Sequence, residues 1–201
     1  EGSKYYNIPS GGQVAIPVDD VLSLLKSFNT YDVYKNDEDK YVVKTYRAGV
    51  VSEMEKKGIT LKMSRSFSKF WKEISTFSTM GNTSLPKASK AELREYQLKG
   101  YSWLWFLYQY GLNGILADDM GLGKTVQTLT LLQKAKEKDK CEPSLVICPT
   151  TVVFNWEKEI EKFAPNLKYL NITGFDRKKK FADIEDYDVV ITSYALVRRD
   201  I

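Results

Sequence analysis

The sequence predicts an α/β protein in which helices cover a parallel sheet, preceded by a smaller α+β unit. Two features indicate this class. Over residues 91–201, short apolar strands alternate with amphipathic helices, a pattern typical of right-handed crossover connections. Residues 78–90 are rich in Ser, Thr, Gly and Pro, which is a linker composition. We place the boundary near Pro86, and expect an accessory region over 1–86 and the larger domain over 87–201.

The smaller unit combines short elements of both kinds. Residues 1–17 contain two adjacent glycines and Pro17, which favour a loop or a remnant of an upstream module. The spacing of apolar residues then predicts helix, strand, helix, strand and helix in turn. These elements are expected over 17–28, 41–48, 49–58, 59–64 and 66–77.

The larger domain is more regular. Its expected helices cover 91–111, 124–137, 152–163 and a short basic stretch near 176–184. Its expected strands cover 114–118, 144–149, 167–172 and 187–192. Because these strands are short, apolar and separated by helices, we expect them to be parallel and covered on both faces.

Composition excludes several classes of site. Histidine is absent, which removes Ser-His-Asp and Cys-His catalysis and His-containing zinc sites. Cys141 and Cys148 are too few for a structural zinc site, and their use fits a reducing, cytoplasmic location. Formal net charge is only +4, so attraction to an anionic partner must come from local clusters. The most apolar window, 101–117, is interrupted by polar residues and is too short for a membrane span. The chain lacks an initiator Met and a signal peptide, so we expect an excised part of a longer protein.

The stretch "MGLGKT" has the parts of a phosphate-binding loop. Gly121 and Gly123 let the backbone approach phosphate, Lys124 can reach the β- and γ-phosphates, and Thr125 can bind Mg²⁺. An apolar strand precedes the loop and an amphipathic helix follows it, which is the expected setting, although Asp118 replaces the first glycine of the strict pattern. The loop residues therefore predict a nucleotide site for ATP and Mg²⁺. Its expected contacts are Met120, Gly121, Leu122, Gly123, Lys124, Thr125 and Val126.

Asp118 and Asp119 stand just before this loop. A unit charge ~8 Å from a phosphate costs about 2 kcal/mol at an effective dielectric constant of 20. We therefore expect both carboxylates to point away from the phosphates, with one of them bracing the loop through the loop's own N–H groups. Two acids after an apolar run could also hold magnesium, but in P-loop enzymes that feature comes from a different strand.

Four segments, in this order, resemble the first half of the motor of the SWI/SNF family of helicase-type ATPases, bacterial branch. They are "LREYQLKGYSWL", "LADDMGLGKTVQT", "LVICPTTVVFNWEKEI" and "VVITSYALVRRD". The resemblance covers residues 91–201 and implies a RecA-like P-loop NTPase lobe that is incomplete. It also implies that Gln97 binds the adenine edge and that Arg94 helps to line the base pocket.

The resemblance further implies contacts to the phosphate backbone of double-stranded DNA. Thr150 and Thr151 follow a strand where a helix begins, so their hydroxyls either cap that helix or hold a DNA phosphate. The run "RKKK" offers Arg177 and Lys178 to phosphates, although such runs are often only solvated surface. Thr192, Ser193 and Tyr194, at the end of the last strand, resemble another DNA-contacting motif.

The leading functional hypothesis is an ATP-dependent translocase or remodeller on double-stranded DNA. Its further partners would be a second RecA-like lobe of the same parent chain and a DNA-bound protein. A P-loop small-molecule kinase and a non-hydrolysing nucleic-acid module are the alternatives. No strand after the loop ends in an Asp-Glu pair, and the arginines of a second lobe are absent, so we expect this chain to bind ATP without hydrolysing it.

Overall fold

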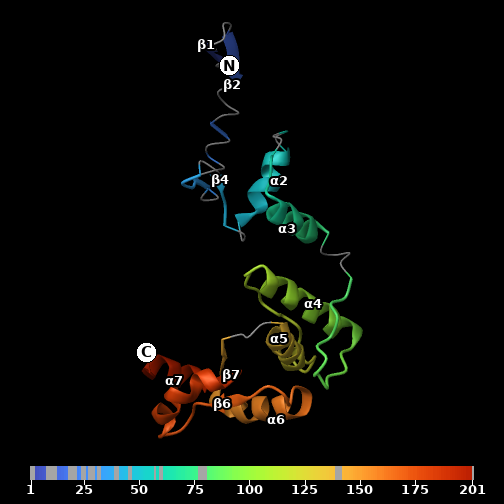
Figure 1. Ribbon diagram of the computed structural model, residues 1–201, viewed down its shortest axis with the longest axis vertical. Helices are drawn as coiled ribbons and strands as arrows, with labels where there is room; N and C mark the ends of the chain where they lie inside the picture. Colours follow the sequence, from blue (N-terminus) through green and yellow to red (C-terminus); the bar gives the residue numbers. More distant parts are fainter. Residues whose placement is uncertain are drawn as a thin grey trace. The chain divides into compact units, whose positions relative to one another are not determined.

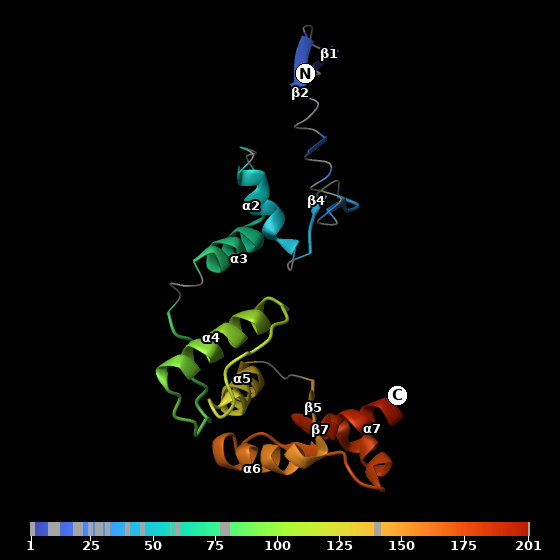
Figure 2. The same cartoon turned by 180° about the vertical axis from the view of Figure 1, so that it is seen from behind.

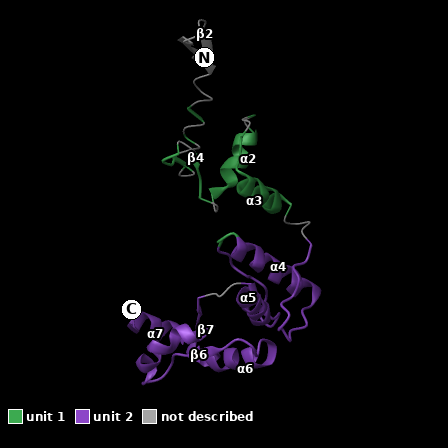
Figure 3. Cartoon of the chain, in the orientation of Figure 1, with its two compact units in different colours: residues 1–80, 110–112 green, residues 81–109, 113–201 purple. Residues whose placement is uncertain are grey.

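The structure is a computed structural model of the 201-residue chain, and part of the chain is described. The described residues are 3–7, 13–17, 22–23, 26, 30, 33–38, 41–44, 47–56, 58, 61–76, 81–138 and 142–200. They fall into two compact units (Figure 3). Unit 1 takes residues 1–80 and 110–112, and unit 2 takes 81–109 and 113–201.

Unit 1 begins with a β-hairpin where the sequence had favoured a loop. Strands β1 (Ser3–Asn7) and β2 (Gln13–Pro17) pair antiparallel along five residues each. The loop prediction for this part is wrong, because it gave weight to the glycines and too little to the aromatic and β-branched residues on either side of them. Such residues on both sides of a glycine pair are a hairpin pattern.

The remainder of unit 1 is a small mixed core. Strands β3 (Tyr34–Lys35) and β4 (Tyr41–Val42) pair antiparallel, and helices α2 (Gly49–Lys56) and α3 (Arg65–Ser75) follow. Ser64 caps α3 by accepting a hydrogen bond from the Phe67 backbone N–H at 3.2 Å.

The expected helices at 49–58 and 66–77 are therefore present with shorter bounds. The strand expected over 41–48 is only two residues long, and residues 61–64 are not a strand. Of the helix expected over 17–28, residues 22, 23 and 26 are helical, and most of the remainder lies outside the described residues.

Unit 2 starts earlier than the sequence predicted, because residues 81–90 are held by side chains of its helices. The Glu137 carboxylate accepts hydrogen bonds from the backbone N–H groups of Lys87 and Ala88 at 2.9 and 2.8 Å. Pro86, where we placed the boundary, is buried. The two units divide between residues 80 and 81, within the linker expected over 78–90, and residues 77–80 lie outside the described part.

The centre of unit 2 is a parallel three-stranded sheet (Figure 1). Its strands β5 (Ser144–Cys148), β7 (Val189–Ser193) and β6 (Tyr169–Asn171) lie in the order β5-β7-β6. All five residues of β7 are buried, as expected for a central strand covered on both faces. The α/β class and the parallel sheet predicted from the alternating pattern are confirmed.

Helices cover both faces of this sheet (Figures 1 and 2). On one face, α5 (Lys124–Lys138) and α6 (Val153–Phe163) pack their apolar side chains against Val189 and Ile191 of β7. Val190 points to the opposite face, since side chains alternate along a strand, and packs there with Ile184 of the 3₁₀ helix η4 (Arg177–Asp186). Helix α4 (Glu95–Gln109) packs on α5, and α7 (Tyr194–Asp200) directly follows β7.

One predicted strand is missing. Residues 113–119 have no regular secondary structure, and the side chain of Ile115 is 86% exposed. The apolar run there satisfies the local pattern of a strand, but a strand also needs a hydrogen-bonded neighbour. Among the described strands, none pairs with this segment. No helix within the described ranges has the length and apolarity to cross a membrane.

Candidate functional site

The phosphate loop predicted from sequence joins residues 113–119 to α5. Gly121 and Gly123 have φ angles of +83° and +79°, in the left-handed region that favours glycine. A Cβ on Gly123 would lie 2.5 Å from Nε2 of Gln97, so a side chain there is excluded by space as well. Around Gly121, by contrast, no described atom lies within 4 Å of a Cβ position. The loop therefore has an open side and a tightly packed side.

Lys124 and Thr125 occupy the first turn of α5. This turn leaves backbone N–H groups without acceptors inside the helix, which suits an anion. The Lys124 ammonium donates hydrogen bonds to the backbone carbonyls of Asp118 and Asp119 at 2.7 and 2.9 Å. Lys124 can exchange these carbonyls for phosphate oxygens, so the residues present fit a nucleotide phosphate.

The carboxylate of Asp118 braces the loop, although by a different partner from the expected one. It accepts a hydrogen bond at 2.8 Å from Nε2 of Gln127, a fully buried residue of α5. The expected partner was a backbone N–H of the loop. The side-chain amide fills this role because Gln127 lies one helical turn beyond Gly123, directly beneath the loop. The Asp119 side chain is exposed.

Gln97, the predicted adenine-binding residue, lies against the same loop. Its Oε1 accepts a hydrogen bond from the Arg94 backbone N–H at 2.9 Å, and its Nε2 donates to the Leu122 carbonyl at 3.1 Å. Tyr96 donates its hydroxyl hydrogen to the same carbonyl at 3.1 Å. Gln97 is buried and the Arg94 side chain is exposed. The structure thus brings Gln97 together with the loop, while its role toward adenine stays a prediction.

The remaining loop residues divide between solvent and core. Met120 is 95% exposed, whereas Val126 is buried within unit 2. Sequence reasoning missed Tyr96 and Gln127. A signal for Gln127 was available, because a glutamine stands among the buried positions of an amphipathic helix, where a polar side chain needs a partner.

Thr150 and Thr151 lie just after β5, in the short 3₁₀ helix η3 (Thr150–Val152) that leads into α6. Both residues are exposed. Neither η3 nor α6 has a side-chain hydrogen bond at its N-cap, so the helix-capping alternative is wrong. Contact of these hydroxyls with a DNA phosphate stays a prediction.

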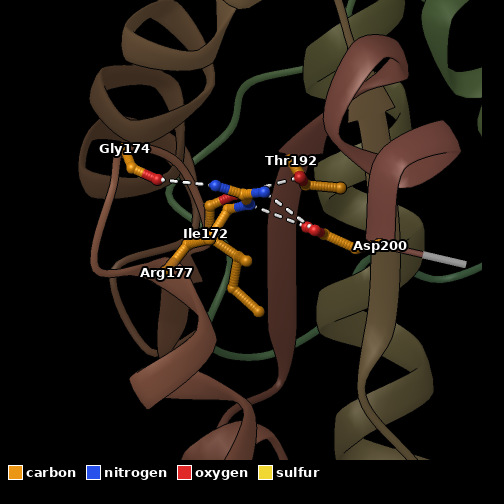
Figure 4. Close-up of polar contacts among 5 residues, drawn as sticks. All are labelled: Ile172, Gly174, Arg177, Thr192 and Asp200. Carbon is orange, nitrogen blue, oxygen red and sulfur yellow. Dashed lines mark hydrogen bonds and ion pairs between the residues drawn. The ribbon is translucent and has the colours of Figure 1, made fainter.

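Arg177 differs from the sequence expectation. Its guanidinium is buried and binds both carboxylate oxygens of Asp200, at 2.7 and 2.8 Å, and the Gly174 carbonyl at 3.1 Å (Figure 4). The hydrogen bonds with Asp200 raise the pKa of Arg177 and lower the pKa of the Asp200 carboxyl. Because its donors are engaged inside the protein, Arg177 is not available to a DNA phosphate. Lys178, its neighbour, is exposed.

Thr192 and Ser193 also differ from the expected DNA contacts. Both are buried at the end of β7, and the Thr192 hydroxyl donates to the Ile172 carbonyl at 3.0 Å (Figure 4). A central strand covered on both faces leaves no surface for these side chains. Cys148 is buried nearby, and burial raises the pKa of its thiol. Cys141 lies outside the described residues.

A model of the SNF2-related domain matches residues 96–201, more than half of the chain. The chain belongs to the SNF2-related family. This match confirms the family predicted from the sequence motifs. The two curated relatives described next are fungal proteins, so the narrower assignment to a bacterial branch is not supported. The motifs on which that assignment rested do not distinguish one branch of the family from another.

Two curated relatives illustrate the similarity of this SNF2-related chain to known proteins. It is 47% identical over 129 residues to the chromatin-remodeling ATPase INO80 of Sclerotinia sclerotiorum, a match that covers 58% of the chain and 8% of the relative. It is 44% identical over 122 residues to the helicase SWR1 of Eremothecium gossypii, with the same two shares. The chain thus spans less than a tenth of the length of either relative.

Solved structures match the same region. The Sulfolobus solfataricus SWI2/SNF2 ATPase core in complex with dsDNA is 46% identical, with a TM-score of 0.56, over 60% of this chain and 25% of that one. A second structure, of the Sulfolobus solfataricus SWI2/SNF2 ATPase core domain, is 48% identical, with a TM-score of 0.53, over 58% of this chain and 24% of that one.

Proposed function

We propose that this chain is the ATP-binding part of an ATP-dependent translocase or remodeller that acts on double-stranded DNA. The main support for the proposal is the phosphate loop of this SNF2-related chain. In this loop Gly121 and Gly123 have φ angles in the left-handed region, and Lys124 begins α5. The names of the relatives, which describe remodelling ATPases and a helicase, support it. So does the similar core studied with dsDNA.

In this proposal the backbone of Gly121 and Gly123 and the ammonium of Lys124 hold the phosphates of ATP. Thr125 supplies a hydroxyl for Mg²⁺, and Gln97 with Arg94 holds the base. Bound ATP supplies the free energy of the phosphoanhydride bond, which drives closure and reopening of two lobes in such motors. The second lobe is a proposed partner from the parent chain.

The proposed DNA surface consists of Thr150, Thr151 and Lys178, which are exposed. In this proposal the hydroxyls and the ammonium contact phosphates, and phosphate contacts carry no sequence information, so binding would be independent of sequence. A DNA-bound protein is a further proposed partner, consistent with relatives that are named for chromatin. A chromatin partner would place the parent in the nucleus, and the cytoplasmic location expected from the cysteines is not confirmed.

Replacing Lys124 tests the ATP site. Lys124→Ala should abolish ATP binding measured by calorimetry while leaving the chain folded, because this lysine provides charge to the ligand and nothing to the apolar core. Lys99→Ala is the matched control, since Lys99 is an exposed lysine of α4 paired with Glu95. Equal ATP affinity in folded Lys124→Ala and in the unaltered chain would refute the site.

The chain by itself is proposed to bind ATP without turnover. The described strands after the loop end at Cys148, Asn171 and Ser193, and none ends in an Asp-Glu pair. An acidic strand end is what positions magnesium and water in P-loop motors. Phosphate release that disappears with Lys124→Ala would contradict this statement. Phosphate transfer to a small acceptor would favour the kinase alternative, and DNA binding without ATP binding would favour the nucleic-acid module.

A further inference from the structure

A single buried amide connects Asp118, two residues before the phosphate loop, to the last glycine of the loop. Nε2 of Gln127 donates to Oδ2 of Asp118 at 2.8 Å, and it lies 3.4 Å from the Gly123 carbonyl oxygen. Gln127 has no exposed surface, whereas Asp118 is partly exposed. The hydrogen bond therefore joins a fixed side chain of α5 to a segment that lacks regular secondary structure.

Packing fixes the orientation of this amide. The backbone of α4 approaches Gln127 so closely that a Cβ on Gly100 would lie 2.0 Å from Oε1. Oε1 is buried, and it has no hydrogen-bond partner among the described residues. Rotating the amide by half a turn would place Oε1 against the Asp118 carboxylate, which is repulsive. Only the observed orientation, with Nε2 toward Asp118, is favourable.

We propose that Asp118 is a positioning residue of the phosphate loop and acts through Gln127. The hydrogen bond holds Asp118 in place, and the backbone carbonyls of Asp118 and Asp119 in turn hold the Lys124 ammonium. A carboxylate next to a phosphate site is then useful, since it accepts a charge-assisted hydrogen bond from a neutral amide. The expected change in ATP affinity rests on the proposed ATP site. The expected change in the exchange of the loop amides does not depend on nucleotide.

Hydrogen–deuterium exchange of the loop amides, measured on the full chain without nucleotide, tests the brace. Asp118→Ala should raise exchange of the Leu122 N–H, which donates to the Asp119 carbonyl at 3.4 Å, about tenfold. This corresponds to about 1.4 kcal/mol, close to the low end for a hydrogen bond to a charged group. Asp118→Asn keeps an acceptor for the amide and should restore protection. Asp183→Ala removes an exposed carboxylate of η4 and serves as the control.

ATP affinity is the second readout, and Asp118→Ala should weaken it about tenfold while Asp118→Asn stays within about twofold. Should Asp118→Ala fail to fold, Gln127→Met removes the donor at similar volume and should raise loop exchange in the same way. Exchange in the Ala or Met variant equal to that of Asp183→Ala would overturn the brace. If the unaltered chain binds no ATP, the proposed function is wrong. The hydrogen–deuterium exchange measurements would still test whether Asp118 positions the loop.

Discussion

Gly100→Ala is the most informative test of how α4 and α5 pack beneath the phosphate loop. In the exposed interior of a helix, this change would stabilise a protein by about 1 kcal/mol, because alanine has a higher helix propensity than glycine. Here the added Cβ would lie 2.0 Å from Oε1 and 3.2 Å from Cδ of Gln127, and 3.6 Å from Leu116. Displacing the amide costs about 1–3 kcal/mol of overpacking, and losing its bond to Asp118 costs about 1.5–3 kcal/mol more. We expect a net destabilisation of about 1.5–5 kcal/mol, since these two costs exceed the gain in propensity.

Urea unfolding of the two chains measures this difference in the free energy of unfolding. The control is the same change in a Gln127→Ala background, where the amide that meets the new methyl group is absent. In that background Gly100→Ala should cost nothing or become stabilising, so the two changes should be strongly non-additive. A Gly100→Ala chain as stable as the unaltered one, or an equal cost in both backgrounds, would refute the packing reasoning.

Three further predictions concern the Arg177–Asp200 pair and its surroundings. Asp200→Asn should lower stability at pH 7, because Arg177 lowers the pKa of the folded carboxyl. The difference in stability should be largest above pH ~4, the ordinary aspartate range, and should shrink as the pH falls through the lowered pKa. Urea midpoints at several pH values measure this difference. A difference that stays constant down to the lowest pH would contradict the prediction. Lys178→Ala should reduce the slope of log DNA affinity against log salt by about 1, and an unchanged slope would remove Lys178 from the DNA surface. Arg177→Gln should destabilise the chain, since it leaves the nearly buried Asp200 carboxylate without its partner. If the variant unfolds on heating at the same temperature as the unaltered chain, this prediction is wrong.

The regular part of the fold could be predicted from sequence because its signals are local and periodic. The helix of residues 124–138 repeats its apolar positions over several turns, and the strands at 144–148 and 189–193 are short and mainly apolar. The loop glycines and Lys124 could be predicted for a similar reason, since their spacing reflects the geometry of one short segment.

Features that depend on distant residues could not be predicted in this way. A basic run is usually exposed, and the carboxylate that buries Arg177 stands 23 positions later in the sequence, beyond any local pattern. The apolar segment 114–118 has the residues of a strand but lacks a described neighbour with which to pair. Thr192 and Ser193 have the hydroxyls of a phosphate contact, yet their place in a central strand buries them.

The order β5-β7-β6 leaves one side of β5 without a described strand beside it. The backbone N–H and C=O groups along that side are a template on which another extended segment can add. Leu145 of this strand adds exposed apolar surface, because its side chain is 58% exposed. Two copies of the chain that meet at this edge would extend the sheet across both molecules, so nucleotide and DNA titrations need dilute protein and a check by sedimentation that the chain stays monomeric.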